Sequence, residues 1–170
     1  MPGGVRRYSW RCVVAAGAVA ALAWSAAHAK DSTAYVKEAE KSIAQGDLKA
    51  AEIQLRNAIR DAPQDPVLRA RLAEVYLQLG DAVSAEREAR AARERNGNEA
   101  DYLPVLADAL LRQQKFANLA ELVQPGDRDP VLESKVRTAL GVAAAGLRDQ
   151  AKAETLLGDA IKLDPRAISP

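Results

Sequence analysis

Residues 46–59 read GDLKAAEIQLRNAI, and 34 residues further along the chain residues 80–92 read GDAVSAEREARAA. The same step of 34 leads from Gly80 to Gln114 and then to Arg148. A constant period of this length indicates a chain built from repeated structural units. It divides most of the sequence into four windows: 32–65, 66–99, 100–133 and 134–167.

Each window has the residue pattern of two helices joined by a tight turn. Gly46 and Gly80 are expected to end the first helices, and Asp47 and Asp81 to cap the second ones. In the second half of windows one, two and four, alanine or leucine recurs at spacings of four and three, which places these residues on one face of a helix. A small residue also recurs at one position of the first half: Ala39, Ala73, Ala107 and Gly141. The sequence therefore predicts an all-α fold of antiparallel helix hairpins.

The third window departs from this pattern. Gln114 takes the place of the turn glycine, and the Pro-Gly pair at 125–126 interrupts the chain soon afterwards. Its second helix must therefore fit between Phe116 and Val123. Pro104 is expected in the first turn of the first helix, where a missing N–H group costs little. We expect this window to be the least regular part of the stack.

These features resemble the tetratricopeptide repeat family over residues 32–167. Beyond the small residues, the family pattern is matched at Tyr76, Ala51, Ala85, Ala153, Pro63 and Pro165. Gly97 stands where the family has its closing proline. The resemblance implies a right-handed superhelical stack of hairpins, a tetratricopeptide α-solenoid. In that fold the first helices line a concave groove that holds a protein or peptide partner.

Residues 46–59, 80–92 and 102–116 (YLPVLADALLRQQKF) are similar to the start of one particular tetratricopeptide family. That family comprises the periplasmic repeat lipoproteins linked to exosortase (PEP-CTERM) sorting and exopolysaccharide export. Its members are much longer, and many carry a lipid-anchoring cysteine, whereas Cys12 precedes the apolar run of this chain. The resemblance implies a non-catalytic binding scaffold of the bacterial cell envelope, in an exopolysaccharide or protein-sorting assembly. The alternative function is a structural spacer within a longer repeat protein.

The first 29 residues have the three-part layout of a secretory signal peptide. Three arginines precede an uncharged run over residues 12–27, and Ala27-His28-Ala29 supplies the small residues of a cleavage site. We expect cleavage after Ala29 and a periplasmic or secreted protein. The alternative is a retained anchor, and a membrane contact is expected only in that case.

Composition narrows the chemistry further. The whole chain has a net charge of +1, and residues 1–29 hold three arginines and no acid, so residues 30–170 carry 1 − 3 = −2. This balance gives no basic surface for nucleic acid. The only Cys and the only His also lie within residues 1–29. We therefore expect no enzyme activity, no metal and no cofactor. A carboxylate-dependent hydrolase is the least favoured alternative.

By resemblance, eight side chains are candidates for the concave groove: Lys37, Glu40, Arg71, Glu74, Gln78, Asp108, Arg112 and Lys135. Three of them, Glu40, Glu74 and Asp108, occupy one column at the 34-residue step. One interpretation is an acidic ladder that meets a basic or hydrogen-bonding ligand. The other is local pairing at helical spacing, which would join Lys37 to Glu40, Arg71 to Glu74 and Asp108 to Arg112.

The sequence also leads to expectations for a charged stretch, for the aromatic side chains and for the last helix. The charged stretch over residues 86–95 is expected to be a solvated helix face. The aromatic side chains are expected to pack in the core or at its edge: Tyr35, Tyr76, Tyr102 and Phe116. The last second helix bears several apolar residues and no polar capping helix follows it. Either a partner or a second copy covers this uncapped C-terminal helix, which would be self-association, or the chain is a piece of a longer array.

Overall fold

The computed structural model describes residues 32–168, and every regular element in this range is a helix. The predicted signal peptide, residues 1–29, lies outside the described residues, as does its cleavage site. Residues 32–44 form the first helix. The later elements are α2 (Leu48–Asp61), α3 (Pro66–Gln78), α4 (Ala82–Glu94), α5 (Glu99–Arg112), α6 (Phe116–Leu122), α7 (Pro130–Gly146), α8 (Gln150–Leu163) and the 3₁₀ helix η1 (Pro165–Ile168). The predicted all-α fold is confirmed.

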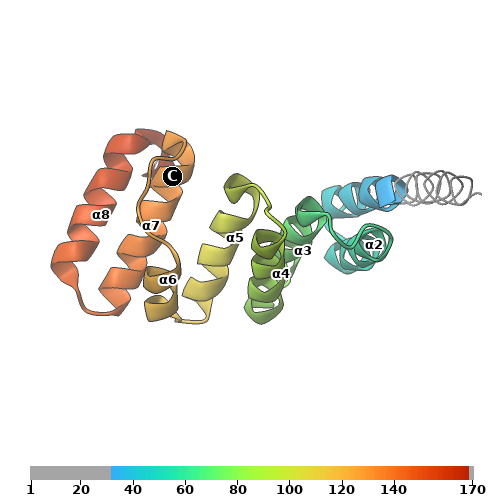
Figure 1. Ribbon diagram of the computed structural model, residues 1–170, viewed down its shortest axis with the longest axis horizontal. Helices are drawn as coiled ribbons and strands as arrows, with labels where there is room; N and C mark the ends of the chain where they lie inside the picture. Colours follow the sequence, from blue (N-terminus) through green and yellow to red (C-terminus); the bar gives the residue numbers. More distant parts are fainter. Residues whose placement is uncertain (1–31, 169–170) are drawn as a thin grey trace, which may run out of the picture.

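The helices follow one another along the long axis of the molecule, from helix 32–44 at one end to α8 at the other (Figure 1). Consecutive helices pack as hairpins, α3 with α4 and α7 with α8. The first helices of successive repeats also touch, α3 with α5 and α5 with α7. One side of the stack is therefore a continuous wall of first helices, and this wall positions the candidate site.

The turn between the two helices of each repeat has the same backbone conformation in all four repeats. Gly46, Gly80, Gln114 and Arg148 all have positive φ, at 76°, 81°, 57° and 66°. After each of them, the next N–H bonds back to a carbonyl of the preceding helix, as from Asp81 to Tyr76 at 2.9 Å. The residues at this position thus form the left-handed closure of a helix C-terminus. The turn conformation therefore follows the 34-residue step to Gln114 and Arg148, although neither is a glycine.

Side-chain caps start most second helices. Asp47, Asp81 and Asp149 each accept a hydrogen bond from the backbone N–H three residues on, at 2.9, 3.0 and 3.1 Å. In the third repeat this position is Lys115, whose side chain makes no cap bond, and α6 has only seven residues. The chain then continues without helix from Val123 to Asp129. The third repeat is therefore the irregular one, as predicted.

Two boundaries differ from expectation. Helix α5 begins at Glu99, so Pro104 lies inside the helix rather than in its first turn. Helix α7 begins at Pro130, which still belongs to the third window. The Asp129 side chain caps this helix by accepting a hydrogen bond from the Val131 N–H at 3.0 Å, and proline suits the first position of a helix. The shortened α6 leaves the chain free to start α7 early.

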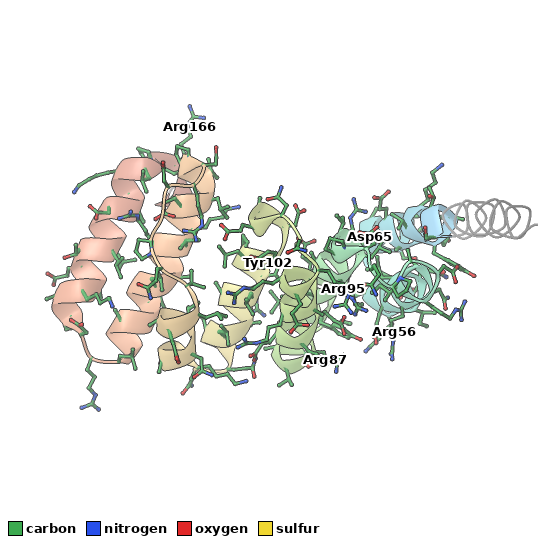
Figure 2. All side chains as sticks on the ribbon, in the orientation of Figure 1. Arg56, Asp65, Arg87, Arg95, Tyr102 and Arg166 are labelled. Carbon is green, nitrogen blue, oxygen red and sulfur yellow. The ribbon has the colours of Figure 1, made fainter. Side chains whose placement is uncertain are left out.

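Alanine dominates the contacts between helices. Ala51, Ala58, Ala85, Ala89 and Ala92 are fully buried, as is Ala143. These small side chains permit close approach of neighbouring helices, and the larger ones fill the remaining space, among them Leu55, Leu106, Leu110 and Leu119. The predicted packing of the tyrosines is confirmed for Tyr76 and Tyr102, both buried. Figure 2 shows Tyr102 in the middle of the stack.

Candidate functional site

The eight predicted groove residues all lie on first helices. Lys37 and Glu40 belong to helix 32–44, and the others are distributed along the wall: Arg71, Glu74 and Gln78 on α3, Asp108 and Arg112 on α5, and Lys135 on α7. They extend over the length of the stack and do not converge on a single point. The structure separates them into a charged part at the first two repeats and an open pocket at the last two.

Two of the acids in the predicted ladder are held by arginines. Arg71 donates to Glu40 across the boundary between helix 32–44 and α3. Arg112 grips Asp108 with Nε 3.1 Å from both carboxylate oxygens, and its Nη1 reaches the Leu77 carbonyl of α3 at 3.2 Å. The predicted local pair Asp108–Arg112 is confirmed. The predicted pairs Lys37–Glu40 and Arg71–Glu74 are wrong, because Arg71 reaches across to the neighbouring repeat instead.

Glu74 is the exception in this column. Among the described residues its carboxylate has no hydrogen bond or ion pair. Burial raises the pKa of Glu74, the nearby charge of Asp101 raises it further, and Arg71 opposes both. A cation or a hydrogen-bond donor brought by a ligand would stabilise the charged form of this carboxylate.

An apolar opening of the wall lies between α5 and α7. It is a pocket of about 420 Å³. Its apolar lining consists of Pro104, Ala107, Leu111, Val136, Ala139 and Val142, and its polar lining of Asp108, Lys135, Thr138 and Asp164. Two predicted residues, Asp108 and Lys135, therefore meet at this site. Lys135 has no ion pair among the described residues, so its ammonium is free at the rim.

Val142 is the main residue that the sequence analysis missed. It stands one 34-residue step beyond Asp108, so the column reads Glu40, Glu74, Asp108, Val142. Its side chain lines the pocket and is 44% exposed. Continuing the column by one step would have found it, because the same position faces the wall in every repeat. The column is therefore acidic over three repeats and becomes apolar at the fourth.

The charged stretch over residues 86–95 is the expected solvated face only in part, because Arg87, Arg93 and Glu94 are exposed while two of its acids are buried. Glu86 is buried and accepts hydrogen bonds from Lys115 at 2.7 Å, Arg90 at 2.8 Å and Gln113 at 3.0 Å. Glu88 is buried against Arg69 of α3, with an oxygen–nitrogen distance of 2.9 Å. Burial acts to raise the pKa of Glu86, but the three donors outweigh it and the pKa is lowered. Glu86 is thus held by the third repeat, and Glu88 by the first helix of its own repeat.

The irregular segment after α6 is held by a third buried acid, Glu133. Glu133 accepts from Arg128 at 3.0 Å, from Arg137 at 2.8 Å and from the Gly126 N–H at 3.0 Å. Arg128 also binds Glu99 of α5 at 2.7 Å. These hydrogen bonds and ion pairs fix the non-helical segment to α5 and α7, where the longer second helix of the other repeats would otherwise pack. Beside the segment a smaller pocket of about 270 Å³ remains between α6, α7 and α8.

The described residues hold no group of three or more His, Cys, Asp or Glu side chains placed to bind a metal ion. Within the same part of the chain, no helix has the length and apolarity needed to span a bilayer. The wall instead offers a shallow apolar pocket, a free ammonium and an unpaired carboxylate. These are groups that bind a ligand through contacts and hydrogen bonds.

Comparison with known proteins supports the fold. Residues 30–99 match the model of DUF6584, a family of unknown function. No curated protein matches the sequence. Among solved structures, the chain is similar to residues 41 to the end of MamA from Desulfovibrio magneticus RS-1, with a TM-score of 0.69 at 18% identity. The match covers 80% of this chain and 77% of that one. MamA is a helical repeat protein of the tetratricopeptide type, so the fold is a right-handed α-solenoid of that type.

Proposed function

We propose that this protein is a non-catalytic scaffold whose wall of first helices holds a segment of a partner protein. A solenoid of the tetratricopeptide type is in general a protein-interaction fold. The observation that carries the proposal is the pocket between α5 and α7, which leaves Val142 largely accessible on a wall whose other repeats present charged groups. An apolar pocket with a few polar groups at its rim is the usual form of a binding site.

The site we propose is therefore the concave face at repeats three and four. The acids Glu40 and Asp108 already have arginine partners: Glu40 joins two helices through Arg71, and Asp108 holds Arg112 within α5. Neither is therefore left to capture a ligand. Lys135 and Glu74 remain free to orient one. The bound partner is a protein segment rather than a nucleic acid, because the wall carries charges of both signs.

We further propose that the scaffold works in the bacterial cell envelope, periplasmic or secreted, in an exopolysaccharide or protein-sorting assembly. This proposal is supported by the signal-like residues 1–29 and by the family resemblance of residues 46–59, 80–92 and 102–116. Mass spectrometry of the exported protein should find Lys30 at its N-terminus. Recovery of intact Met1 from membranes would instead mean that the segment is an anchor.

Self-association is the second candidate, and a separate surface favours it. Helix α8 exposes Ile161 and Leu163, at 46% and 37% of their surface, on the outer side of the last repeat. A second copy packed there would bury both. Sedimentation velocity over a range of concentrations would detect it, and a species that stays monomeric at every concentration would exclude it.

The pocket is tested by comparing Val142→Asp with Val83→Asp. Val83 is 65% exposed on α4, outside the pocket, so both changes place a carboxylate at an accessible site. Peptides are first selected on the purified protein from a random display library, and their affinities are measured by fluorescence anisotropy. We expect Val142→Asp to weaken binding about tenfold or more, as loss of an apolar anchor does, and Val83→Asp to change it less than twofold.

Circular dichroism of both variants checks that the helices are intact. If the selected peptides bind Val142→Asp as tightly as the unaltered protein, the groove is not the binding site. A structural spacer, which presents no ligand site, is expected to select no peptide that depends on Val142.

A further inference from the structure

Two carboxylates lie on the same wall, on the α3 side of the apolar pocket. Glu74 of α3 and Asp101 of α5 have no hydrogen bond or ion pair from their side chains among the described residues. They are close enough for the charge of Asp101 to act on Glu74. Arg71, the cation whose charge acts on Glu74, forms its ion pair with Glu40. The wall therefore presents two exposed carboxylates that have no ion pair among the described residues.

This acidic pair is continuous with the pocket. Asp101 precedes Pro104 by three positions and Asp108 by seven, which places the three on one stripe of α5. Pro104 and Asp108 line the pocket. Asp101 therefore lies about one helical turn before the pocket, on the face of α5 that lines it.

We infer that the partner segment is an extended basic–apolar peptide, with a Lys or Arg side chain at Glu74 and Asp101 and an apolar side chain in the α5–α7 pocket. This inference rests on the proposed function and names the chemistry of its ligand. Neighbouring packed helices are about 8–10 Å apart, and an extended chain advances about 3.3 Å per residue. The two side chains are therefore expected about three residues apart.

Charge on the wall also sets the order of the two groups. The free ammonium of Lys135 lies on the α7 side of the pocket and repels a cation there. The acidic pair lies on the opposite side, at α3 and α5. The basic residue of the ligand is therefore directed towards α3, and only one direction of the peptide along the wall satisfies both sites.

The test repeats the library selection on a Glu74→Gln/Asp101→Asn variant. Its matched control is Glu121→Gln/Glu154→Gln, which removes the same two charges from exposed acids on the second helices α6 and α8. We expect peptides selected on the unaltered protein to carry Lys or Arg two to four residues from an apolar side chain. The groove variant should weaken their binding about tenfold, and the control should change it less than twofold.

A double-mutant cycle separates specific contact from general charge. Replacing the basic residue of a selected peptide by Gln should weaken binding to the unaltered protein and have no effect on the Glu74→Gln/Asp101→Asn variant. Peptides without any basic residue that still require Val142 would overturn this inference and leave the groove in place. Equal losses with the groove and control variants would also overturn it. Peptides insensitive to Val142 and to the acidic pair would reject the proposed function itself.

Discussion

At the scale of single residues, the turn position shows how the repeat tolerates a strained backbone. Gly46 and Gly80 take positive φ without a side chain to clash, whereas Gln114 and Arg148 take it with one. A left-handed conformation costs a residue with a Cβ about 1–2 kcal/mol. The surrounding helix closure, including the bond from the Lys115 N–H to the Leu110 carbonyl at 2.9 Å, keeps the conformation in place.

Opposite substitutions at two equivalent turns should therefore have opposite effects. Gly80→Ala is expected to lower the free energy of unfolding by about 1 kcal/mol, although no atom lies within 4 Å of the added Cβ. Gln114→Gly is expected to raise it by about 0.5 kcal/mol, because relief of strain exceeds the added freedom of the unfolded chain. Urea denaturation followed by circular dichroism measures both.

Gly46→Ala is the matched repeat of the first change, since Gly46 also has positive φ and open space around it. A stabilised Gly80→Ala protein, or a Gln114→Gly protein less stable than the original, would show that the strain argument does not describe this turn.

Side-chain partners were the hardest residue-level feature to predict from sequence. Local spacing found Asp108–Arg112, which lies within one helix. It could not find Glu40–Arg71, whose partners are 31 residues apart and meet only when two repeats pack. The left-handed turn at Gln114 was predictable because a constant period carries backbone geometry from one repeat to the next, whatever the residue type.

At the scale of elements, Glu86 joins the second repeat to the third. It lies on α4, and its donors Gln113 and Lys115 lie in the turn between α5 and α6. The equivalent acid of the first repeat, Glu52, likewise accepts from Tyr76 of α3 at 3.2 Å. Such bonds hold neighbouring hairpins in register in addition to the apolar contacts.

Glu86→Gln should weaken this joint. An amide leaves these half-buried donors without an acceptor of full charge, so the free energy of unfolding at pH 7 should fall by about 1–3 kcal/mol. Because the folded-state pKa of Glu86 lies below its ordinary value of 4.5, its charge stabilises the fold above that pH and stops doing so as the pH falls through the lowered pKa. The difference in the free energy of unfolding between the original protein and Glu86→Gln should therefore become smaller as the pH falls.

Glu154→Gln supplies the control for this joint. Glu154 occupies the same position of the fourth repeat but is exposed, and its replacement should change stability by less than about 0.5 kcal/mol. Urea titrations at pH 7 and pH 4 compare the two variants. A gap between the original protein and Glu86→Gln that widens on acidification would contradict the assigned role of the carboxylate.

At the scale of the whole molecule, the fold followed from the sequence more fully than the site did. Hairpin number, turn positions and the short α6 all derive from a period and from proline and glycine, which act locally. The burial of Glu86 depends on the repeat that covers it, and the pocket beside Val142 depends on how α5 and α7 pack. These are properties of packing between repeats, which no single window of sequence contains.

The short α6 has a mechanical consequence. Because each hairpin touches chiefly its neighbours, a load applied to the ends of the stack passes through the repeats in series. At the third repeat little second-helix surface is available to carry it. The load there runs through the α5–α7 contact and through Arg128, which connects Glu99 of one helix to Glu133 of the other. We therefore expect the third repeat to deform more easily under load than the other repeats. This repeat also lines the pocket that we propose holds the ligand.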